Sequence, residues 1–173
     1  MFYKYPFDSL PKIDNSNVTT YYMKSMFESC KATDIDLSNI NTSNVYDIRR
    51  IFYTSSVVNL NLLNFNASKV NKVKDAFQFC DYLKNINGCF RNLGENYSVS
   101  DSANYSDYEL NLSLANNITE QSIINMLNGL YDIATKGCNT QSVKLGSTNL
   151  AKLTSEEGQL ALTQAQNYGW TVA

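Results

Sequence analysis

The acidic side chains are the first residues of this sequence that could do chemistry. Asp34 and Asp36 are two positions apart, so a strand would place both carboxylates on one face, where a carboxylate-based glycosidase would need them. Glu156 and Glu157 are adjacent, and neighbouring residues of a helix point about 100° apart, so these two do not face one another. With Thr154 they instead resemble a helix N-terminus with a capping box. We expect solvent-exposed or capping carboxylates and no enzyme.

Histidine is absent, and the cysteines are scattered. Without histidine there is no Ser-His-Asp triad, no Cys-His pair and no imidazole metal site. Cys30, Cys80, Cys89 and Cys138 lack the close pairs that a zinc site needs. We expect most of them to be small buried residues, with a disulfide between Cys80 and Cys89 left open. No cofactor and no metal ion are expected.

The polar character of the chain comes from uncharged side chains. The 173 residues include 23 Asn, 18 Ser and 12 Thr, whereas charged residues make up only 17%. A net charge of −2 gives no general attraction for nucleic acid or for an anionic membrane. No apolar run approaches the length of a membrane span, and residues 1–6 do not begin a signal peptide. We therefore expect no nucleic-acid partner and no membrane insertion.

A repeat of 25 residues organises the first half of the chain. Phe2, Phe27, Phe52 and Phe77 stand at this interval, and many other apolar positions keep the same register. A period between 20 and 50 residues predicts a solenoid, in which each unit buries its apolar face against its neighbours. Because Phe2 already occupies a repeat position, the stack begins without a recognisable N-terminal cap.

Each repeat is predicted to contain a short strand and a short helix. Leu60 and Leu62 alternate as the buried face of a strand does. The apolar residues of segments 45–52 and 70–77 recur at the spacing of one helical face. Ser43 and Ser68 are then suited to cap these helices.

A row of polar residues falls between strand and helix. Asp14, Asn39 and Asn64 are in register. We expect these side chains to satisfy backbone groups where the chain leaves the strand. Ligand recognition by the same row is the functional alternative.

The C-terminal part is predicted to consist of longer strand–helix cycles. A strand over 108–114 precedes a helix that begins at Thr119 and ends near Gly137. A second strand at 143–145 precedes a helix capped by Thr154, whose apolar face carries residues such as Leu160. Residues 170–172 form the last strand. These cycles would close the end of the solenoid.

Residues 26–45 carry a resemblance to a known family. Met26-Phe27-Glu28-Ser29-Cys30, followed by Ile35-Asp36-Leu37-Ser38-Asn39-Ile40-Asn41-Thr42-Ser43-Asn44-Val45, resembles the BspA-like leucine-rich repeat. The match is specific over residues 26–52 and good to about residue 80, although Ser55 replaces the cysteine of the pattern. The resemblance implies binding and display rather than catalysis, because the family occurs in surface and adhesion proteins of bacteria and parasites and in phage-encoded proteins.

The expected fold is an α/β, leucine-rich-repeat-like solenoid of short strands and short helices with a C-terminal strand–helix capping region. Residues 1–93 would be the BspA-like repeats, residues 94–107 a polar loop or insertion, and residues 108–173 a cap continuous with the solenoid.

The chain end carries a second resemblance. Residues 145–153, the acidic helix after them and Gly169-Trp170-Thr171-Val172-Ala173 resemble the C-terminal end of many bacteriophage tail and fibre structural proteins, over roughly residues 110–173. Together the two resemblances imply a non-enzymatic bacteriophage virion protein, structural, decorating or part of a tail fibre, that uses its repeat surface for protein–protein or host-surface binding. The alternative is a fragment of a bacterial cell-surface adhesin. The expected location is accordingly the virion, or else the bacterial cell surface.

Two sets of residues are candidate contacts. Tyrosine combines apolar area with a hydroxyl group, so a set of tyrosines is the candidate binding surface for a host receptor. This set is Tyr21, Tyr22, Tyr46, Tyr53, Tyr82, Tyr97, Tyr105 and Tyr108. The uncapped N-terminal end is the candidate contact with other virion proteins or with copies of the chain. Its residues are Phe2, Tyr3, Tyr5, Phe7, Leu10 and Ile13.

Overall fold

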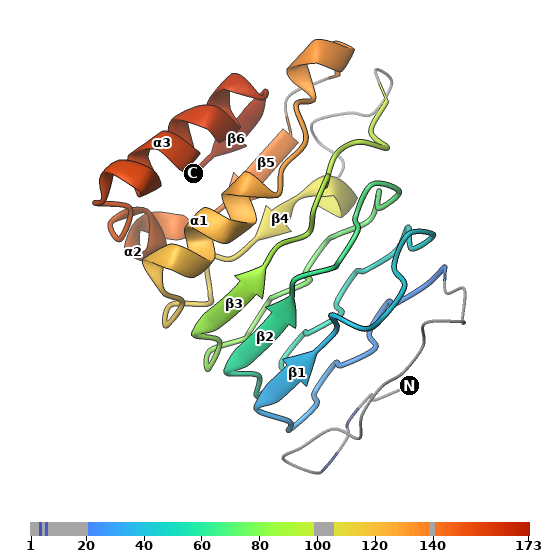
Figure 1. Cartoon of the computed structure of the whole chain (residues 1–173). Coiled ribbons are helices and arrows are strands. Elements are labelled where there is room, and N and C mark those ends of the chain that lie inside the picture. Colours follow the sequence, from blue (N-terminus) through green and yellow to red (C-terminus); the bar gives the residue numbers. More distant parts are fainter. Residues whose placement is uncertain (1–3, 5, 7–20, 99–105, 139–140) are drawn as a thin grey trace.

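The fold contains two short parallel sheets. The computed structural model describes residues 4, 6, 21–98, 106–138 and 141–173 (Figure 1). The first sheet has the order β1–β2–β3, with β1 at Asp34–Asp36, β2 at Asn59–Leu62 and β3 at Asn85–Gly88. The second has the order β4–β5–β6, with β4 at Leu110–Asn111, β5 at Gln141–Lys144 and β6 at Trp170–Val172. The described part of the chain is thus of the α/β class and forms no closed barrel.

The strand register follows the sequence repeat. Ile35 pairs with Leu60 at an interval of 25 residues, and Leu60 pairs with Ile86 at an interval of 26. Up to Cys80 the third coil keeps the interval of 25, so the extra residue lies between Cys80 and Leu83. Tyr82 is part of this insertion and is 65% exposed.

The short helices expected in the repeats are wrong. Segments 45–52 and 70–77 consist of turns, in which the N–H groups of Ile48 and Phe52 donate to Lys72 O and Ala76 O of the next coil, at 2.9 and 3.0 Å. An N–H group that bonds to a neighbouring coil cannot also close a helical turn. Arg50 adds a positive φ of 55°, which a right-handed helix excludes. The apolar spacing of a helical face fits these turns equally well.

The caps predicted at Ser43 and Ser68 belong to turns instead. The N–H of Ser43 donates to Asn41 Oδ1 at 3.1 Å, and that of Ser68 donates to Asn66 Oδ1 at 3.0 Å. Each asparagine side chain thus closes a turn with the backbone two residues later.

Stacked phenylalanines fill the interior of the repeats. The buried rings of Phe27 and Phe52 are 5.7 Å apart, and those of Phe52 and Phe77 are 5.4 Å apart. Phe90 continues the stack at 5.6 Å from Phe77. The periodic phenylalanines at 27, 52 and 77 are therefore confirmed as core residues, whereas Phe2 lies outside the described residues.

A helix covers the free edge of β3. Helix α1, at Glu120–Asn128, packs beside β3 where a further strand would otherwise pair (Figure 1). The N–H of Ile86 donates to Ser122 Oγ at 2.8 Å, and Asn125 Nδ2 donates to Ile86 O at 2.9 Å. The side chains of α1 thus satisfy backbone groups that an exposed edge would leave open to other chains.

The C-terminal elements agree with the sequence in type and differ in their ends. Thr119 caps α1 as predicted, but this helix ends at Asn128, and Gly137 closes a separate 3₁₀ turn at Ala134–Lys136. Helices α2, at Gly146–Leu150, and α3, at Glu156–Asn167, follow β5. The predicted strand over 108–114 is realised as the two residues of β4.

Two details of α3 correct the prediction. Its cap is Ser155 rather than Thr154, because Glu120 Oε1 accepts hydrogen bonds from the N–H groups of both residues and leaves the Ser155 Oγ to accept from Gly158 N–H. Leu160 is 65% exposed and lies outside the buried face.

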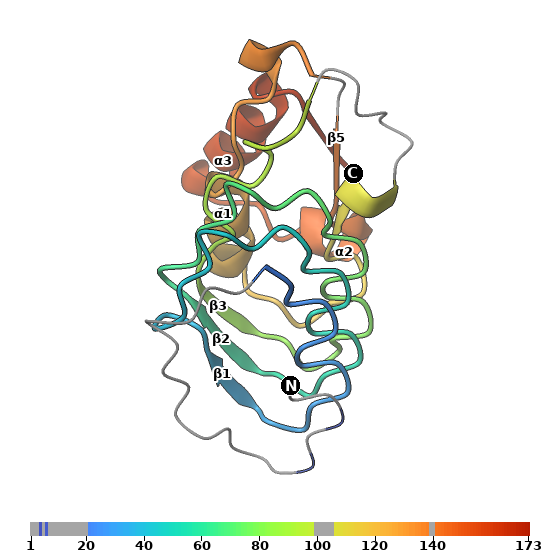
Figure 2. The same cartoon turned by 90° about the vertical axis from the view of Figure 1, so that its right-hand side faces the viewer.

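The two sheets are joined through side-chain and backbone contacts. The carbonyl of Asp107 accepts the N–H groups of Val73 and Lys74, at 2.6 and 3.1 Å. The rings of Tyr97 and Trp170 are 5.9 Å apart. Figure 2 shows the second sheet and its helices stacked at one end of the repeat coils. No helix in the described ranges is long and apolar enough to span a membrane.

Candidate binding face

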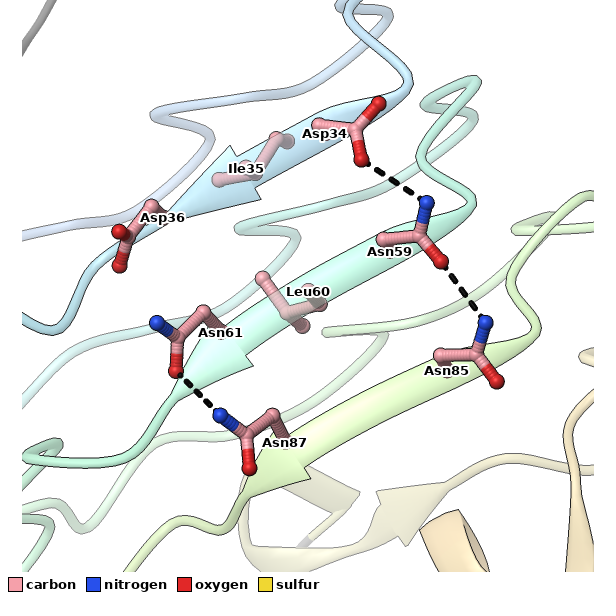
Figure 3. Close-up of a pocket in the computed structure, with 8 residues that line it drawn as sticks. All are labelled: Asp34, Ile35, Asp36, Asn59, Leu60, Asn61, Asn85 and Asn87. Atoms are coloured by element: carbon pink, nitrogen blue, oxygen red, sulfur yellow. Dashed lines mark hydrogen bonds between the residues drawn. The ribbon is translucent and has the colours of Figure 1, made fainter.

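The outward side of the first sheet is lined by carboxylates and amides. Alternate residues of a strand point to opposite sides, so Ile35 and Leu60 enter the core while their neighbours face outward (Figure 3). The outward residues form two rows that cross the three strands, and we call them together the polar face. Its members are Asp34, Asn59 and Asn85 in the first row, and Asp36, Asn61 and Asn87 in the second.

Hydrogen bonds between strands hold the first row in place. Asn85 Nδ2 donates to Asn59 Oδ1 at 2.8 Å, and Asn59 Nδ2 donates to Asp34 Oδ1 at 2.8 Å. The second oxygen of Asp34 accepts from Thr33 Oγ1 at 2.8 Å. Every amide of this row therefore has a set orientation, and the chain of donors ends on a carboxylate.

The second row is tied partly to the backbone. Asn87 Nδ2 donates to Asn61 Oδ1 at 3.1 Å, and the same oxygen accepts from Leu63 N–H at 3.2 Å. Asp36 Oδ1 accepts from Ser38 N–H at 2.9 Å. Both carboxylates of β1 thus serve as hydrogen-bond acceptors for their own sheet and turn.

A trough of about 270 Å³ lies between the two rows. Its walls are the six residues of the polar face, and its floor is formed at Ile35 and Leu60. An amide side chain both donates and accepts hydrogen bonds, whereas an ionised carboxylate accepts only. The trough can therefore bind neutral or donor-rich groups.

A second hollow adjoins the trough beside the first row. It has a volume of about 300 Å³ and is lined by Lys31, Thr33, Ser56, Val58 and Tyr82. Thr33 and Val58 immediately precede Asp34 and Asn59 in the sequence. The exposed ring of Tyr82 thus flanks the polar face.

The predicted tyrosines do not form one surface. Tyr21, Tyr22 and Tyr82 are 54%, 61% and 65% exposed, and Tyr46, Tyr53 and Tyr108 are half-buried. Tyr22 contacts Tyr46, with ring centroids 4.6 Å apart, and Tyr53 contacts the exposed Phe79 at 5.5 Å. Tyr82 alone among the tyrosines lines the hollow beside the polar face as the structure describes it.

Tyr97 is a correction to the predicted surface. It is 1% exposed, its ring lies 4.8 Å from that of Tyr108, and its hydroxyl donates to Tyr108 O at 3.4 Å. A buried ring between two aromatic neighbours belongs to the core, so its assignment to a binding surface is wrong.

Several predicted contact residues lie outside the described residues. They are Tyr105 of the tyrosine set and Phe2, Tyr3, Tyr5, Phe7, Leu10 and Ile13 of the N-terminal set.

The cysteines are free thiols in the structure. Cys80 and Cys89, for which a disulfide was left open, do not pair. The Cys80 thiol donates to Phe52 O at 2.9 Å, and burial raises its pKa to about 12, so the reactive thiolate is strongly disfavoured. Cys30 is also buried, as expected, whereas Cys89 and Cys138 are half-buried.

Charged groups cluster away from the polar face. Arg49 contacts Asp47 at 2.7 Å and Asp107 at 3.2 Å, and so links the repeat coils to the segment before β4. Burial alone would raise the pKa of Asp47, but the hydrogen bonds and charge of Arg49, with the charge of Lys72, hold it below its ordinary value. In the described ranges, no three His, Cys, Asp or Glu side chains are arranged to hold a metal ion.

Sequence reasoning found the carboxylates of the polar face and missed its four asparagines. A signal was available, because the 25-residue register aligns Asp34 with Asn59 and Asp36 with Asn61. The row that it did single out has a structural role at Asn64, whose Nδ2 donates to Ser38 O at 3.0 Å. Asp14 of that row lies outside the described residues.

Comparison with known proteins yields one match. Residues 1–93 match the model of a family described as Mycoplasma protein of unknown function, DUF285, which is associated with BspA-like repeat proteins. No curated protein and no solved structure matches the chain.

Proposed function

Because the chain belongs to the DUF285 family, we propose that it is a non-enzymatic binding module whose repeat coils form a solenoid and present the polar face to a partner. The observation that carries this proposal is the bonding of the polar face itself. Its carboxylates and amides are held in two rows by hydrogen bonds such as that from Asn59 Nδ2 to Asp34 Oδ1. Side chains fixed in this way lose little entropy on binding, which favours recognition of a partner.

The location of the module is proposed from the family. A family described from Mycoplasma supports display on a bacterial cell surface. The resemblance of residues 145–173 to phage tail and fibre proteins favours a second candidate, a virion component that attaches to its host. In both cases the polar face and Tyr82 would contact the host surface, and the N-terminal end would contact neighbouring proteins or copies of the chain.

Binding to intact cells tests the proposal. The purified, fluorescently labelled chain would be titrated onto bacterial and animal cells, and bound label would be measured by flow cytometry. We expect saturable binding that the double variant N85K/N87K abolishes, because two long cationic side chains would fill the trough. Asn167→Lys provides the matched control, since Asn167 is exposed at the end of α3.

Two results would contradict the proposal. One is the absence of saturable binding to any cell surface by a chain whose circular dichroism shows that it is folded. The other is equal loss of binding in N85K/N87K and N167K. Mass spectrometry of purified virions and of cell envelopes would then separate the two locations.

A further inference from the structure

We infer that the trough of the polar face binds a neutral, linear chain of pyranose sugars laid across the three strands, with Tyr82 stacked on a ring at its edge. This inference rests on the proposed function and names the ligand class for the same face.

The first argument is the spacing of the rows. Neighbouring strands of a sheet are about 4.8 Å apart, so each row repeats its polar groups at that distance. A pyranose ring linked through opposite positions has nearly this length from one linkage oxygen to the next. Asp34, Asn59 and Asn85 would therefore meet successive sugars in equivalent places, as would the residues of the second row (Figure 3).

An extended peptide fits this spacing poorly. It advances about 3.4 Å per residue, and its side chains return to the same side after about 6.8 Å. Neither distance matches the interval between strands. A peptide laid across the strands would thus lose register with the amides after the first contact.

The second argument is the hydrogen-bonding capacity left over in the rows. Asn59 uses one N–H group towards Asp34 and accepts one hydrogen bond from Asn85. An amide has two N–H groups and two acceptor positions, so a donor and an acceptor remain side by side. Neighbouring hydroxyl groups of a sugar, each of which donates and accepts, are complementary to this pair.

The third argument is charge. The walls of the trough carry two carboxylates, Asp34 and Asp36, both on β1, and the remaining four are neutral amides. Like charges at close range repel, so uronic acid, sulfate or phosphate groups are disfavoured at this end. Hydroxyl groups can donate to the carboxylate oxygens, which selects a neutral sugar.

The fourth argument is the position of Tyr82. The third coil contains one residue more than the others, and the insertion places this tyrosine, 65% exposed, in the hollow beside the first row. An exposed aromatic ring offers a flat apolar surface with a hydroxyl at its edge. The C–H face of a pyranose ring can stack on such a surface while its hydroxyls reach the amides.

Titration with defined oligosaccharides tests the inference. Cellohexaose and chitohexaose are the neutral probes, a hyaluronan hexasaccharide is the anionic probe, and binding would be measured by calorimetry and saturation-transfer NMR on the full chain. We expect saturable binding of a neutral probe, at least tenfold weaker in N85K/N87K and at least threefold weaker in Tyr82→Ala. Asn167→Lys and Tyr21→Ala, which alter exposed residues elsewhere, should leave it unchanged.

The carboxylates allow a test of specificity. The double variant D34N/D36N removes both charges while keeping side chains of similar shape, so it should bind the hyaluronan probe at least fivefold more tightly than the unaltered chain. Failure of both neutral probes to bind, or binding that is the same in N85K/N87K, would overturn the inference.

Treatment of the cells separates this inference from the proposed function. Periodate cleaves neighbouring diols of sugars, and protease removes surface proteins. Face-dependent binding that periodate abolishes supports a sugar ligand. Face-dependent binding that protease abolishes and periodate leaves intact would overturn the sugar inference while leaving the binding function standing, and the absence of face-dependent binding would end both.

Discussion

The repeat coils, residues 21–98, and the C-terminal region, residues 106–173, build parallel sheets by different means. In the coils the connections between strands are turns whose N–H groups donate to the next coil, as Phe52 does to Ala76. In the C-terminal region the connections contain α1, α2 and α3, which satisfy most of their own backbone groups. A turn in the coils therefore needs a neighbour on both sides, whereas a helix does not.

This difference explains where the stack of coils stops. Helix α1 occupies the place beside β3 that a further strand would take, and it offers β3 side chains such as Ser122 and Asn125 instead of a new backbone edge. Because the backbone of a helix is bonded internally, nothing further has to pair with it. The helices thus end the repeat at its C-terminal side.

The largest expected effect tests whether the two regions unfold together. Phe52→Ala removes the middle ring of the phenylalanine stack and should lower the free energy of unfolding by about 3–5 kcal/mol. Urea unfolding would be followed by circular dichroism for the whole chain and by the fluorescence of Trp170, the single tryptophan, for the C-terminal region. We expect both transitions to shift together, because Trp170 contacts Tyr97. An unshifted fluorescence transition would show that the regions are independent, and Leu160→Ala serves as the exposed control.

Two glycines compare the regions directly. Gly88 has a φ of +82°, and a Cβ there would lie 2.7 Å from backbone atoms of Leu62 and Leu63 in the neighbouring coil. Gly88→Ala should therefore cost about 3 kcal/mol, from left-handed strain and the forced separation of two coils. Gly137 has a φ of +64° with nothing near its Cβ position, so Gly137→Ala should cost only about 1 kcal/mol. Equal costs in chemical denaturation would contradict the close packing of coils.

A third variant loosens the link between the regions. Asp47→Ala removes the buried carboxylate that positions Arg49 towards Asp107, and it should cost about 1–3 kcal/mol. Hydrogen exchange should rise around Val73 and Lys74, whose N–H groups donate to Asp107 O. Exchange that rises only around residue 47 would indicate that the ion pairs do not couple the two regions.

The smallest effect concerns a pH-dependent contact within the C-terminal region. Hydrogen bonds from the backbone and side chain of Ser155, and from the backbone of Thr154, hold the pKa of Glu120 below its ordinary value. A lowered pKa in the folded state stabilises above the ordinary pKa, and this stability is lost as the pH falls through the folded value. Glu120→Gln should thus lower the melting temperature slightly at pH 7 and not at low pH. A difference that stays constant with pH would contradict this role.

Much of the repeat could be predicted from the sequence, because burial follows side-chain type. The positions of Phe27, Phe52 and Phe77 and the inward side chains of β1 and β2 follow from the 25-residue register. The caps of the C-terminal helices depend on local residues, and Thr119 was found correctly. At Ser155 the prediction was off by one residue, because the group that displaced Thr154 is Glu120, far away in the sequence.

Only the tertiary structure decided what the coils do with their backbone and what stands on their outer side. Apolar spacing in segments 45–52 and 70–77 is the same for a helix and for turns, and the choice depends on hydrogen bonds to the next coil. The polar face likewise depends on side chains from three strands that meet only when the coils stack, as Asn59 does with Asp34 and Asn85. The sequence determined the period and the core of this protein. Stacking decided its surface, because strands a full repeat apart become neighbours only in the folded chain.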